Sequence, residues 1–376
     1  MLQYVHGGDI QTYIDRHGFA PLDLSANINP FGIPDAVRAA MHRAVDNCTQ
    51  YPDPFCRAAR QAIGAREGVN PDFLYCGNGA ADVLDRLAAV LKPRKVLLTA
   101  PTFAEYERTL SGAEIRVHNL REMDGFALTE RILDEISPDL DAVDLCNPNN
   151  PTGALYPKEV LQQIVDLARE HQLMIFSDEI YDRLVMDGLE HISIASMAPD
   201  LFCVTFSGLS KSHMIAGYRV GWMILSGNKA IAKDYIEGIN MLTNMRICSN
   251  VPAQSIVQTA LGGHQSVHDY IVPGGRIHDQ RDYIYDALNS IPGITAVKPK
   301  AAFYIFPKID IKKFNVHDDE QFALDLLHDK RILITRGGGF NWHEPDHFRI
   351  VYLPRIEVLK DATNKLSDFL SYYWQS

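Results

Sequence analysis

The stretch from Ala142 to Gly153, AVDLCNPNNPTG, places a mostly apolar run directly before a cluster of turn-forming residues. The run 142–146 is typical of a buried strand, and the Asn-Pro and Pro-Thr-Gly steps that follow it are common turns. Residues 158–171 then show the spacing of an amphipathic helix, and residues 173–176 form a second apolar run. This order of strand, loop, helix and strand predicts one unit of a parallel sheet.

The same alternation continues on both sides of this unit. Strands separated by helices predict an α/β fold with a mostly parallel sheet whose two faces are covered. Further strands are expected at residues 95–100, 202–206 and 218–225, with a helix at residues 82–91.

The C-terminal part of the chain follows a different pattern. We expect a strand at residues 299–307, a helix at 321–328 and another strand at 331–335, which indicates a smaller domain of mixed helices and strands. The expected division is a large domain of residues 41–268 and a small domain of residues 269–376, with an N-terminal segment of residues 1–40 joining the small domain.

The composition limits the class of protein. The 376 residues are 46% hydrophobic and 22% charged, which excludes a disordered chain, and the net charge of −11 argues against a nucleic-acid partner. The longest run without Asp, Glu, Lys or Arg, Ile247–His268, is too polar to cross a membrane. Scattered cysteines and an N-terminus without signal-peptide features predict a cytoplasmic protein. No metal site is expected, because Pro345 interrupts the helix that His343 and His347 would need to bind zinc together.

Polar residues gather where the predicted strands end. Residues 147–153 follow one strand, residues 177–181 the next and residues 206–211 a third, while residues 77–82 open a helix. Each segment is ordinary alone, since Asn-Pro forms turns and Asp often caps helices. The carboxyl ends of parallel strands form one edge of a sheet, where ligands bind. Together these segments therefore predict one cofactor site.

The residue types match the needs of pyridoxal 5′-phosphate (PLP). Lys211, which follows Ser210, supplies an amine for the aldehyde, and we expect cationic neighbours to lower its pKa. Asp178 can keep the pyridine nitrogen protonated, and Asn150 and Tyr181 can hydrogen-bond to the phenolate oxygen.

The phosphate and the ring face of PLP also have candidate partners. The amide groups of Gly79, Ala80 and Ala81 at a helix start can bind the phosphate together with Arg219. Phe103 can stack on the ring.

Four short motifs carry a family resemblance: Asn150-Pro-Thr-Gly, Asp178-x-x-Tyr181, Ser210-Lys211, and Arg219 eight residues after Lys211. They resemble those of class I and II aminotransferases of PLP fold type I, and the resemblance covers essentially the whole chain. It implies a large domain with a seven-stranded, mostly parallel sheet, a smaller α/β domain, and a homodimer with sites at the interface. Tyr51 matches the tyrosine that family members extend to the partner subunit's cofactor phosphate.

Two parts of the chain resemble different relatives. From about residue 147, stretches such as FSGLSKSHMIAGYRVGWMIL and GFNWHEPDHFRIVYLPR are similar to bacterial alanine aminotransferases. Before about residue 110, HGGDI, LDLSANINPFG and APTFAEYERTL are similar to threonine-phosphate decarboxylase and, less closely, to histidinol-phosphate aminotransferase.

The resemblance also implies substrate contacts. Arg349 matches the arginine that binds the substrate α-carboxylate, and Ala26 and Asn27 are expected near the substrate. Arg336 stands where alanine aminotransferases carry a histidine. It either adds a cation at the substrate end or faces solvent.

The expected activity is PLP-dependent, ping-pong transamination between alanine and 2-oxoglutarate, with Lys211, Asp178 and Tyr181 as the catalytic residues. The alternative is a decarboxylase, or a histidinol-phosphate aminotransferase-like enzyme, acting on a phosphorylated amino substrate. A third class, a ligand sensor without enzymatic activity, fits less well because the set of cofactor residues is complete.

Overall fold

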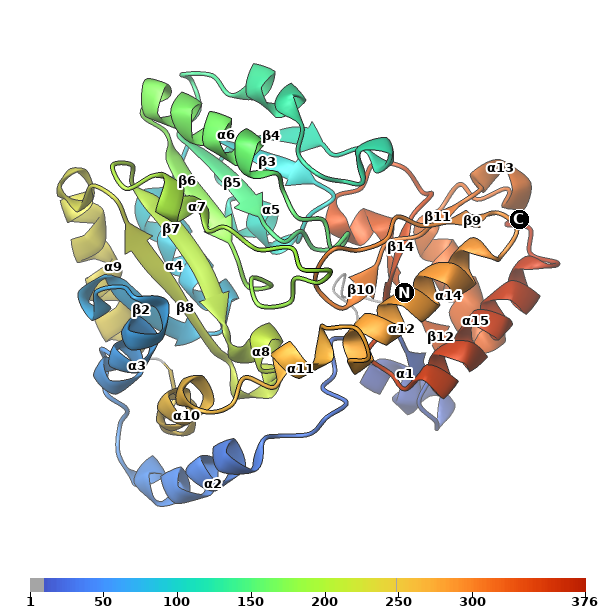
Figure 1. Cartoon of the computed structure of the whole chain (residues 1–376), viewed down its shortest axis with the longest axis horizontal. Coiled ribbons are helices and arrows are strands. Elements are labelled where there is room, and N and C mark those ends of the chain that lie inside the picture. The colour runs from blue at the N-terminus through green and yellow to red at the C-terminus, as the bar shows by residue number, and fades with distance from the viewer. Residues whose placement is uncertain (1–9, 248) are drawn as a thin grey trace.

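The computed structural model describes residues 10–247 and 249–376. A seven-stranded sheet forms its largest part (Figure 1). In spatial order the strands are β2 (Leu74–Asn78), β8 (Val220–Ser226), β7 (Cys203–Gly208), β6 (Met174–Asp178), β5 (Ala142–Cys146), β3 (Lys95–Ala100) and β4 (Glu114–Asn119). The neighbours from β7 to β4 pair in parallel, whereas β8 runs antiparallel to β7 and β2. The expected α/β fold with a mixed, mostly parallel sheet is confirmed.

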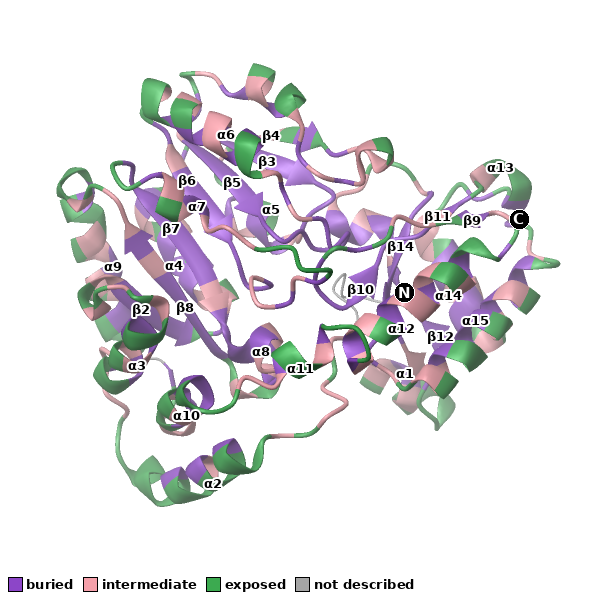
Figure 2. Cartoon of the chain, viewed as in Figure 1, coloured by how far each residue is buried: buried purple, intermediate pink, exposed green. Residues whose placement is uncertain are grey.

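Helices cover both faces of this sheet, whose strands are mostly buried except for the edge strand β4 (Figure 2). The apolar stripe of α6 (Lys158–His171) packs in a cluster on one face, and that of α4 (Ala80–Leu91) packs in a cluster on the other. The remaining helices of this part are α3 (Arg57–Glu67), α5 (Glu105–Thr109), α7 (Ile194–Met197), α8 (Leu209–Ser212), α9 (Lys233–Arg246) and α10 (Val251–Gly262). No helix within the described residues is both long and apolar enough to span a membrane.

Short strands and four helices make up the C-terminal part, which lies beside the large sheet (Figure 1). The strands form a three-stranded sheet of β10 (Tyr304–Ile305), β14 (Phe348–Val351) and β13 (Thr335–Arg336), and a pair of β11 (Lys308–Ile309) with β9 (Ile294–Thr295). The helices are α12 (Arg276–Asn289), α13 (Ile311–Phe314), α14 (Asp319–Lys330) and α15 (Ile356–Leu370).

The N-terminal segment contacts this C-terminal part. Its strand β1 (Leu22–Asp23) pairs in parallel with β12 (Ile332–Leu333). The other helices outside the large sheet are α1 (Ile10–His17), α2 (Asp35–Ala44) and α11 (Val267–Tyr270). The domain boundaries after residues 40 and 268 stay a prediction.

The expected strand at residues 299–307 is mostly irregular. Only Tyr304 and Ile305 form a strand, because Ala302 adopts the left-handed conformation (φ 66°) and breaks the extended run. Ala301 instead forms an isolated bridge to Val185. The alternating residue types reflect burial, but the backbone of this segment forms a loop that hydrogen-bonds to Gly153 and Leu184, in the loops that follow β5 and β6.

Candidate active site

A cavity of about 410 Å³ lies at the carboxyl ends of β5, β6 and β7. Its wall includes most of the residues expected around the cofactor and substrate: Ala26, Asn27, Ala80, Ala81, Phe103, Asn150, Asp178, Tyr181, Ser210, Lys211, Arg219 and Arg349. These residues come from the strand ends of the large sheet, from the start of α4, from the N-terminal segment and from β14. The fold thus collects them at the edge where a parallel sheet presents its loops.

Lys211 lies on the short helix α8, directly after β7 ends. Its Nζ is 5.8 Å from the centre of the Tyr181 ring. Burial lowers the pKa of Lys211 to about 7, and the positive charges of Arg349 and Arg219 act in the same direction while Asp178 opposes them. A large fraction of this amine is therefore unprotonated at neutral pH, as a nucleophile or a general base requires.

Asp178 ends β6 and is almost fully buried. The Tyr106 hydroxyl donates to its Oδ2 at 2.6 Å, and the Ile180 amide donates to its Oδ1 at 3.1 Å. Burial raises the pKa of Asp178, and these two hydrogen bonds and the charge of Lys211 oppose that rise. The carboxyl group is thus held in one orientation, with its oxygens fixed by neighbours on two sides.

Arg349 reaches the cavity from β14 and is buried. Its Nη1 donates to Asn150 Oδ1 at 2.9 Å, and its Nη2 donates to the Ser25 carbonyl at 2.7 Å. Its Nε is buried and has no hydrogen-bond partner among the described residues. The guanidinium packs against the rings of Tyr304 and Phe340, at 5.2 and 4.7 Å from their centres. This buried fork retains donor capacity for a planar anion such as a carboxylate.

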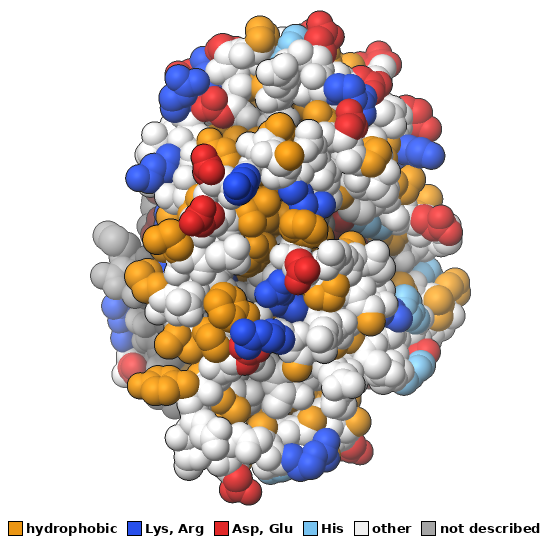
Figure 3. Space-filling view, turned by 90° about the vertical axis from the view of Figure 1, so that its left-hand side faces the viewer, with side chains coloured by type: hydrophobic (Ala, Val, Ile, Leu, Met, Phe, Trp, Pro, Cys, Tyr) orange, Lys and Arg blue, Asp and Glu red, His pale blue; other side chains and the backbone are white. Residues whose placement is uncertain are grey.

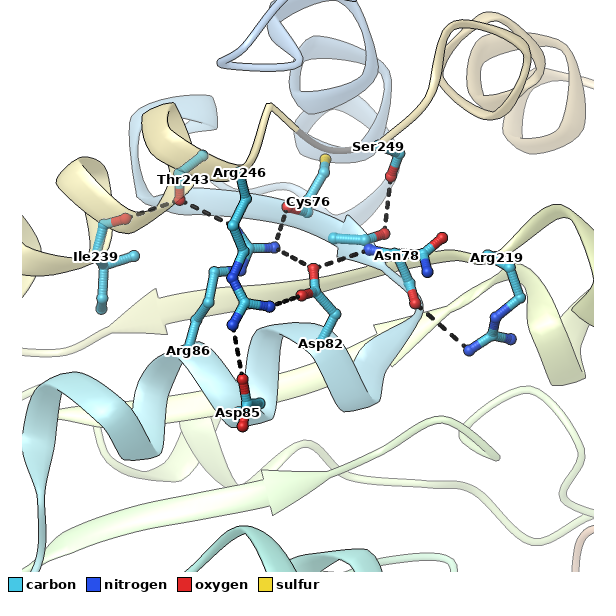
Figure 4. Close-up of polar contacts among 11 residues, drawn as sticks. Cys76, Asn78, Asp82, Asp85, Arg86, Arg219, Ile239, Thr243, Arg246 and Ser249 are labelled. Atoms are coloured by element: carbon cyan, nitrogen blue, oxygen red, sulfur yellow. Dashed lines mark hydrogen bonds and ion pairs between the residues drawn. The ribbon is translucent and has the colours of Figure 1, made fainter.

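The turn between β2 and α4 forms a cradle for an anion. Gly79 has a φ of +89°, and a Cβ built on it would lie 2.2 Å from Nη2 of Arg219. The guanidinium of Arg219 donates to the Ala216 carbonyl at 3.0 Å. It also donates to the Asn78 carbonyl at 3.5 Å, which holds it over the turn (Figure 4). A guanidinium beside the first amide groups of a helix is a favourable phosphate site.

Three of the expected site residues are not part of the cavity wall: Gly79, which forms the turn described above, Tyr51 and Arg336. Tyr51 is 89% exposed. Arg336 pairs instead with Asp319 at 3.4 Å and Glu320 at 3.5 Å.

The sequence left two positions open for Arg336, at the substrate end or facing solvent, and the strand register shows which way its side chain is directed. In the antiparallel pair of β13 and β14, Thr335 lies opposite Arg349 and Arg336 lies opposite Phe348. Paired residues share a face of the sheet, so Arg336 lies on the face opposite to the one from which Arg349 reaches the cavity.

The structure adds residues that the sequence reasoning missed. Tyr106, Cys146 and Ser25 also line the cavity, and Tyr106 binds Asp178 directly. The spacing of Tyr106, three residues after Phe103, was an available signal, because residues three apart share one side of a helical turn. Their rings meet edge to face, with centres 5.6 Å apart.

Comparison with known proteins identifies the family. The model of the aminotransferase class I and II family matches residues 20–366. The chain belongs to this family. It is 46% identical to the glutamate-pyruvate aminotransferase AlaA of Haemophilus influenzae over 96% of the chain and 93% of that protein. It is 36% identical to the threonine-phosphate decarboxylase of Salmonella typhimurium, over 92% of the chain and 91% of that protein. An aminotransferase structure from Escherichia coli superposes with a TM-score of 0.93 at 39% identity, covering all of this chain and 98% of the other.

The cavity of this aminotransferase fits the PLP on which the family depends. Lys211 offers an amine of lowered pKa to the aldehyde, and Asp178 offers a fixed carboxyl group to the ring nitrogen. Gly79 has no Cβ, so the turn leaves room beside the guanidinium of Arg219, and together they fit a phosphate. The unpartnered Nε of Arg349 then remains for the substrate. Within the described residues, no group of three or more His, Cys, Asp or Glu side chains could hold a metal ion.

Proposed function

We propose that this aminotransferase transfers an amino group between glutamate and pyruvate, and in reverse between alanine and 2-oxoglutarate. The observation that carries the proposal is the buried guanidinium of Arg349, whose unpartnered Nε lies in one cavity with the low-pKa amine of Lys211. This pair provides the α-carboxylate site and the base that an amino-acid substrate needs. The choice of glutamate and pyruvate rests on the name of the Haemophilus influenzae relative.

Each residue of the cavity has a separate role in the reaction. When bound, PLP supplies an electron sink for the negative charge that develops at the substrate Cα. Lys211 Nζ removes the proton from Cα of the amino donor, and in the second half of the ping-pong reaction it delivers a proton to Cα of the newly formed amino acid, as an amine with a pKa of about 7 can do in both directions. Asp178, fixed by Tyr106, keeps the ring nitrogen protonated. Asn150 and Tyr181 are proposed to hold the phenolate oxygen, Phe103 the ring face, and Ser210 the phosphate side.

Arg349 has a second role in the choice of reaction. By binding the α-carboxylate in its fork, it fixes which bond to Cα is turned toward the electron sink. Because the carboxylate is held by the guanidinium, the bond from Cα to the carboxylate is kept away from the electron sink. The Cα–H bond is then the one turned toward the electron sink, and Lys211 breaks it. Ala26 and Asn27, on the cavity wall, are proposed to limit the size of the substrate side chain.

The charge of the cavity favours transamination over the decarboxylation of a phosphorylated substrate. Within the described residues, the cations on the cavity wall are Lys211, Arg219 and Arg349. Their proposed partners are the aldehyde of PLP, the phosphate of PLP and the α-carboxylate of the substrate, in that order. A second phosphate would need a further cation, and Arg336 is engaged elsewhere by Asp319 and Glu320. The resemblance of the first third of the chain to the decarboxylase therefore reflects shared fold and cofactor rather than shared substrate.

A substrate panel tests this proposal. Purified enzyme is supplied with single amino donors and 2-oxo acids, threonine phosphate is included, and CO₂ release is measured in parallel. We expect glutamate with pyruvate, and alanine with 2-oxoglutarate, to give the highest kcat/KM without CO₂. Release of CO₂ from threonine phosphate as the fastest reaction would overturn the proposal.

We also propose that the enzyme is a homodimer. The face over α9 and α2 carries exposed apolar side chains among charged ones (Figure 3). Met241 and Met245 of α9 are 68% and 69% exposed, and Tyr51, which follows α2 in the chain, is 89% exposed. Large exposed apolar side chains that gather on one face are typical of an association surface. In such a dimer Tyr51 reaches the partner's PLP phosphate.

Two further proposals concern the domains and the location. One apolar cluster consists mainly of residues of the C-terminal part, and two others consist mainly of residues of the large sheet and its helices. This division supports a large domain of residues 41–268 and a small domain of residues 269–376 that the N-terminal segment joins. The described cysteines are all free thiols, which supports a cytoplasmic location.

A further inference from the structure

Arg86 is a fully buried arginine beneath the phosphate-binding turn, and the roles above do not use it. Asp82 and Arg86, one helical turn apart on α4, both face the turn at residues 77–79 (Figure 4). Nη2 of Arg86 donates to the Cys76 carbonyl and, at 2.9 Å, to Asp82 Oδ2. Nη1 donates to Thr243 Oγ1 at 2.9 Å, which ties the guanidinium to α9.

Asp82 extends these contacts to the backbone of the turn. Its Oδ2 also accepts from the Asn78 amide at 3.0 Å, and its Oδ1 accepts from Arg246 Nη1 at 2.5 Å. Arg246 in turn binds Asp85 at 2.9 Å. The Asp82 carboxylate therefore links the guanidinium of Arg86 to the strand end that leads into the phosphate cradle.

The backbone of the turn is held at consecutive groups. Arg86 holds the Cys76 carbonyl, and Ser249 Oγ donates to the Gly77 carbonyl at 2.8 Å. A Cβ built on Gly77 would lie 2.4 Å from Nη2 of Arg86 and 2.5 Å from Oδ2 of Asp82. The guanidinium thus fills the space that a side chain at position 77 would occupy, so the glycine and the buried arginine depend on each other.

The contacts show how Arg86 acts. Its charge is partly cancelled by Asp82 at 2.9 Å, so direct attraction for a phosphate is weakened. Its two bonds from Nη2, to a carbonyl and to a carboxylate, instead fix the path of the chain. A buried guanidinium that lost these partners would be strongly destabilising, so the arrangement holds one conformation of the turn.

We propose that Arg86 is a positioning residue for the PLP phosphate. Through the Cys76 carbonyl and the Asp82 carboxylate it holds the turn at residues 77–79 in the shape that brings the start of α4 and Arg219 together around the phosphate. The proposal concerns the phosphate alone, and it stands whichever amino acid is the substrate.

The test compares two ligands that differ only in the phosphate. Full-length apoenzyme is titrated with PLP and with pyridoxal, and the absorbance of the bound aldehyde gives both dissociation constants. In Arg86→Met we expect PLP to bind about ten- to a hundredfold more weakly and pyridoxal to bind within about threefold of the wild type. Inorganic phosphate should also compete less well with PLP in this variant.

Arg281→Met is the matched control. The Arg281 side chain is also fully buried and paired, with Asp187 at 2.7 Å and with Asp282 at 2.7 Å, but it lies on α12. It should keep the wild-type ratio of pyridoxal to PLP dissociation constants even where its stability falls.

One result overturns the proposal: a wild-type ratio of the two dissociation constants in Arg86→Met, whether both affinities are unchanged or both fall equally. Where Arg86→Met does not fold, Asp82→Asn decides, because it weakens the acceptor of the Asn78 amide while keeping the side-chain shape. A selective loss of PLP affinity in Asp82→Asn supports the proposal, and an unchanged ratio contradicts it.

Discussion

Lys211 has the two properties that a nucleophilic amine needs, an enclosed position and a lowered pKa. Burial and two nearby guanidinium groups bring this pKa to about 7 from an ordinary value of 10.5. Only the unprotonated amine attacks an aldehyde, so PLP uptake by the apoenzyme should accelerate as the pH rises and level off above pH 7. Stopped-flow absorbance measures this rate, and we expect a midpoint near pH 7. A midpoint near 10.5, the value of an ordinary lysine, would show that the site does not lower the pKa.

Arg349 and Arg336 test the substrate site as a pair. Arg349→Lys keeps the charge but loses the planar fork, so kcat/KM should fall about ten- to a hundredfold for every amino donor and every 2-oxo acid. Arg336→Ala should leave kcat/KM within about twofold for alanine and for glutamate alike, because Arg336 pairs with two carboxylates outside the cavity. Steady-state kinetics with both substrate pairs gives the comparison. A selective loss of glutamate activity in Arg336→Ala would place that side chain at the substrate.

At the scale of elements, the turn from β2 into α4 depends on a residue without a side chain. Gly79→Ala should weaken PLP binding at least about tenfold, because its φ of +89° disfavours a Cβ and that Cβ would meet Arg219. Gly112→Ala is the control, since nothing lies within 4 Å of its built Cβ. Spectroscopic titration with PLP measures both variants. Equal affinity in the two variants would show that the turn tolerates a side chain.

Some elements could be predicted from local sequence alone. The strands at residues 95–100 and 142–146 and the helix at residues 158–171 have the expected bounds, because a proline or a turn follows the apolar run. The strand expected at residues 299–307 could not be corrected from sequence. Ala302 adopts the left-handed conformation, and its amide donates to the carbonyl of Leu184, a distant residue that no local pattern indicates.

The residues of the site also differ in whether the sequence alone could place them. Lys211 and Asp178 could be placed from sequence, because both follow strands whose ends meet at one edge of a parallel sheet. The spacing of Tyr106 from Phe103 could have brought Tyr106 to the site, but its bond to Asp178 could not be predicted, since it joins residues 72 positions apart. The position of Arg336 stayed open, because the register between β13 and β14 decides which face each residue occupies, and a two-residue strand carries no sequence pattern that shows this register.

At the scale of the whole molecule, the exposed methionines of α9 test the proposed dimer. Met245→Glu places a charge on a side chain that is 69% exposed in one chain and buried in the proposed interface. We expect light scattering to show a shift from dimer to monomer, with a loss of activity because Tyr51 no longer reaches the partner's site. Met123→Glu, at a side chain that is 82% exposed on another segment, should stay dimeric. If both variants stay dimeric, Met245 is not part of the dimer interface.

The central claim is that this molecule moves an amino group from glutamate to pyruvate with Lys211 as the base. The most direct measurement supplies ¹⁵N-glutamate and unlabelled pyruvate, and follows the label by mass spectrometry in the wild-type enzyme and in Lys211→Ala. The account predicts ¹⁵N-alanine and 2-oxoglutarate in equal amounts from the wild-type enzyme, and a rate lower by about three orders of magnitude or more in the variant. Alanine without label, or an undiminished rate in Lys211→Ala, would contradict it.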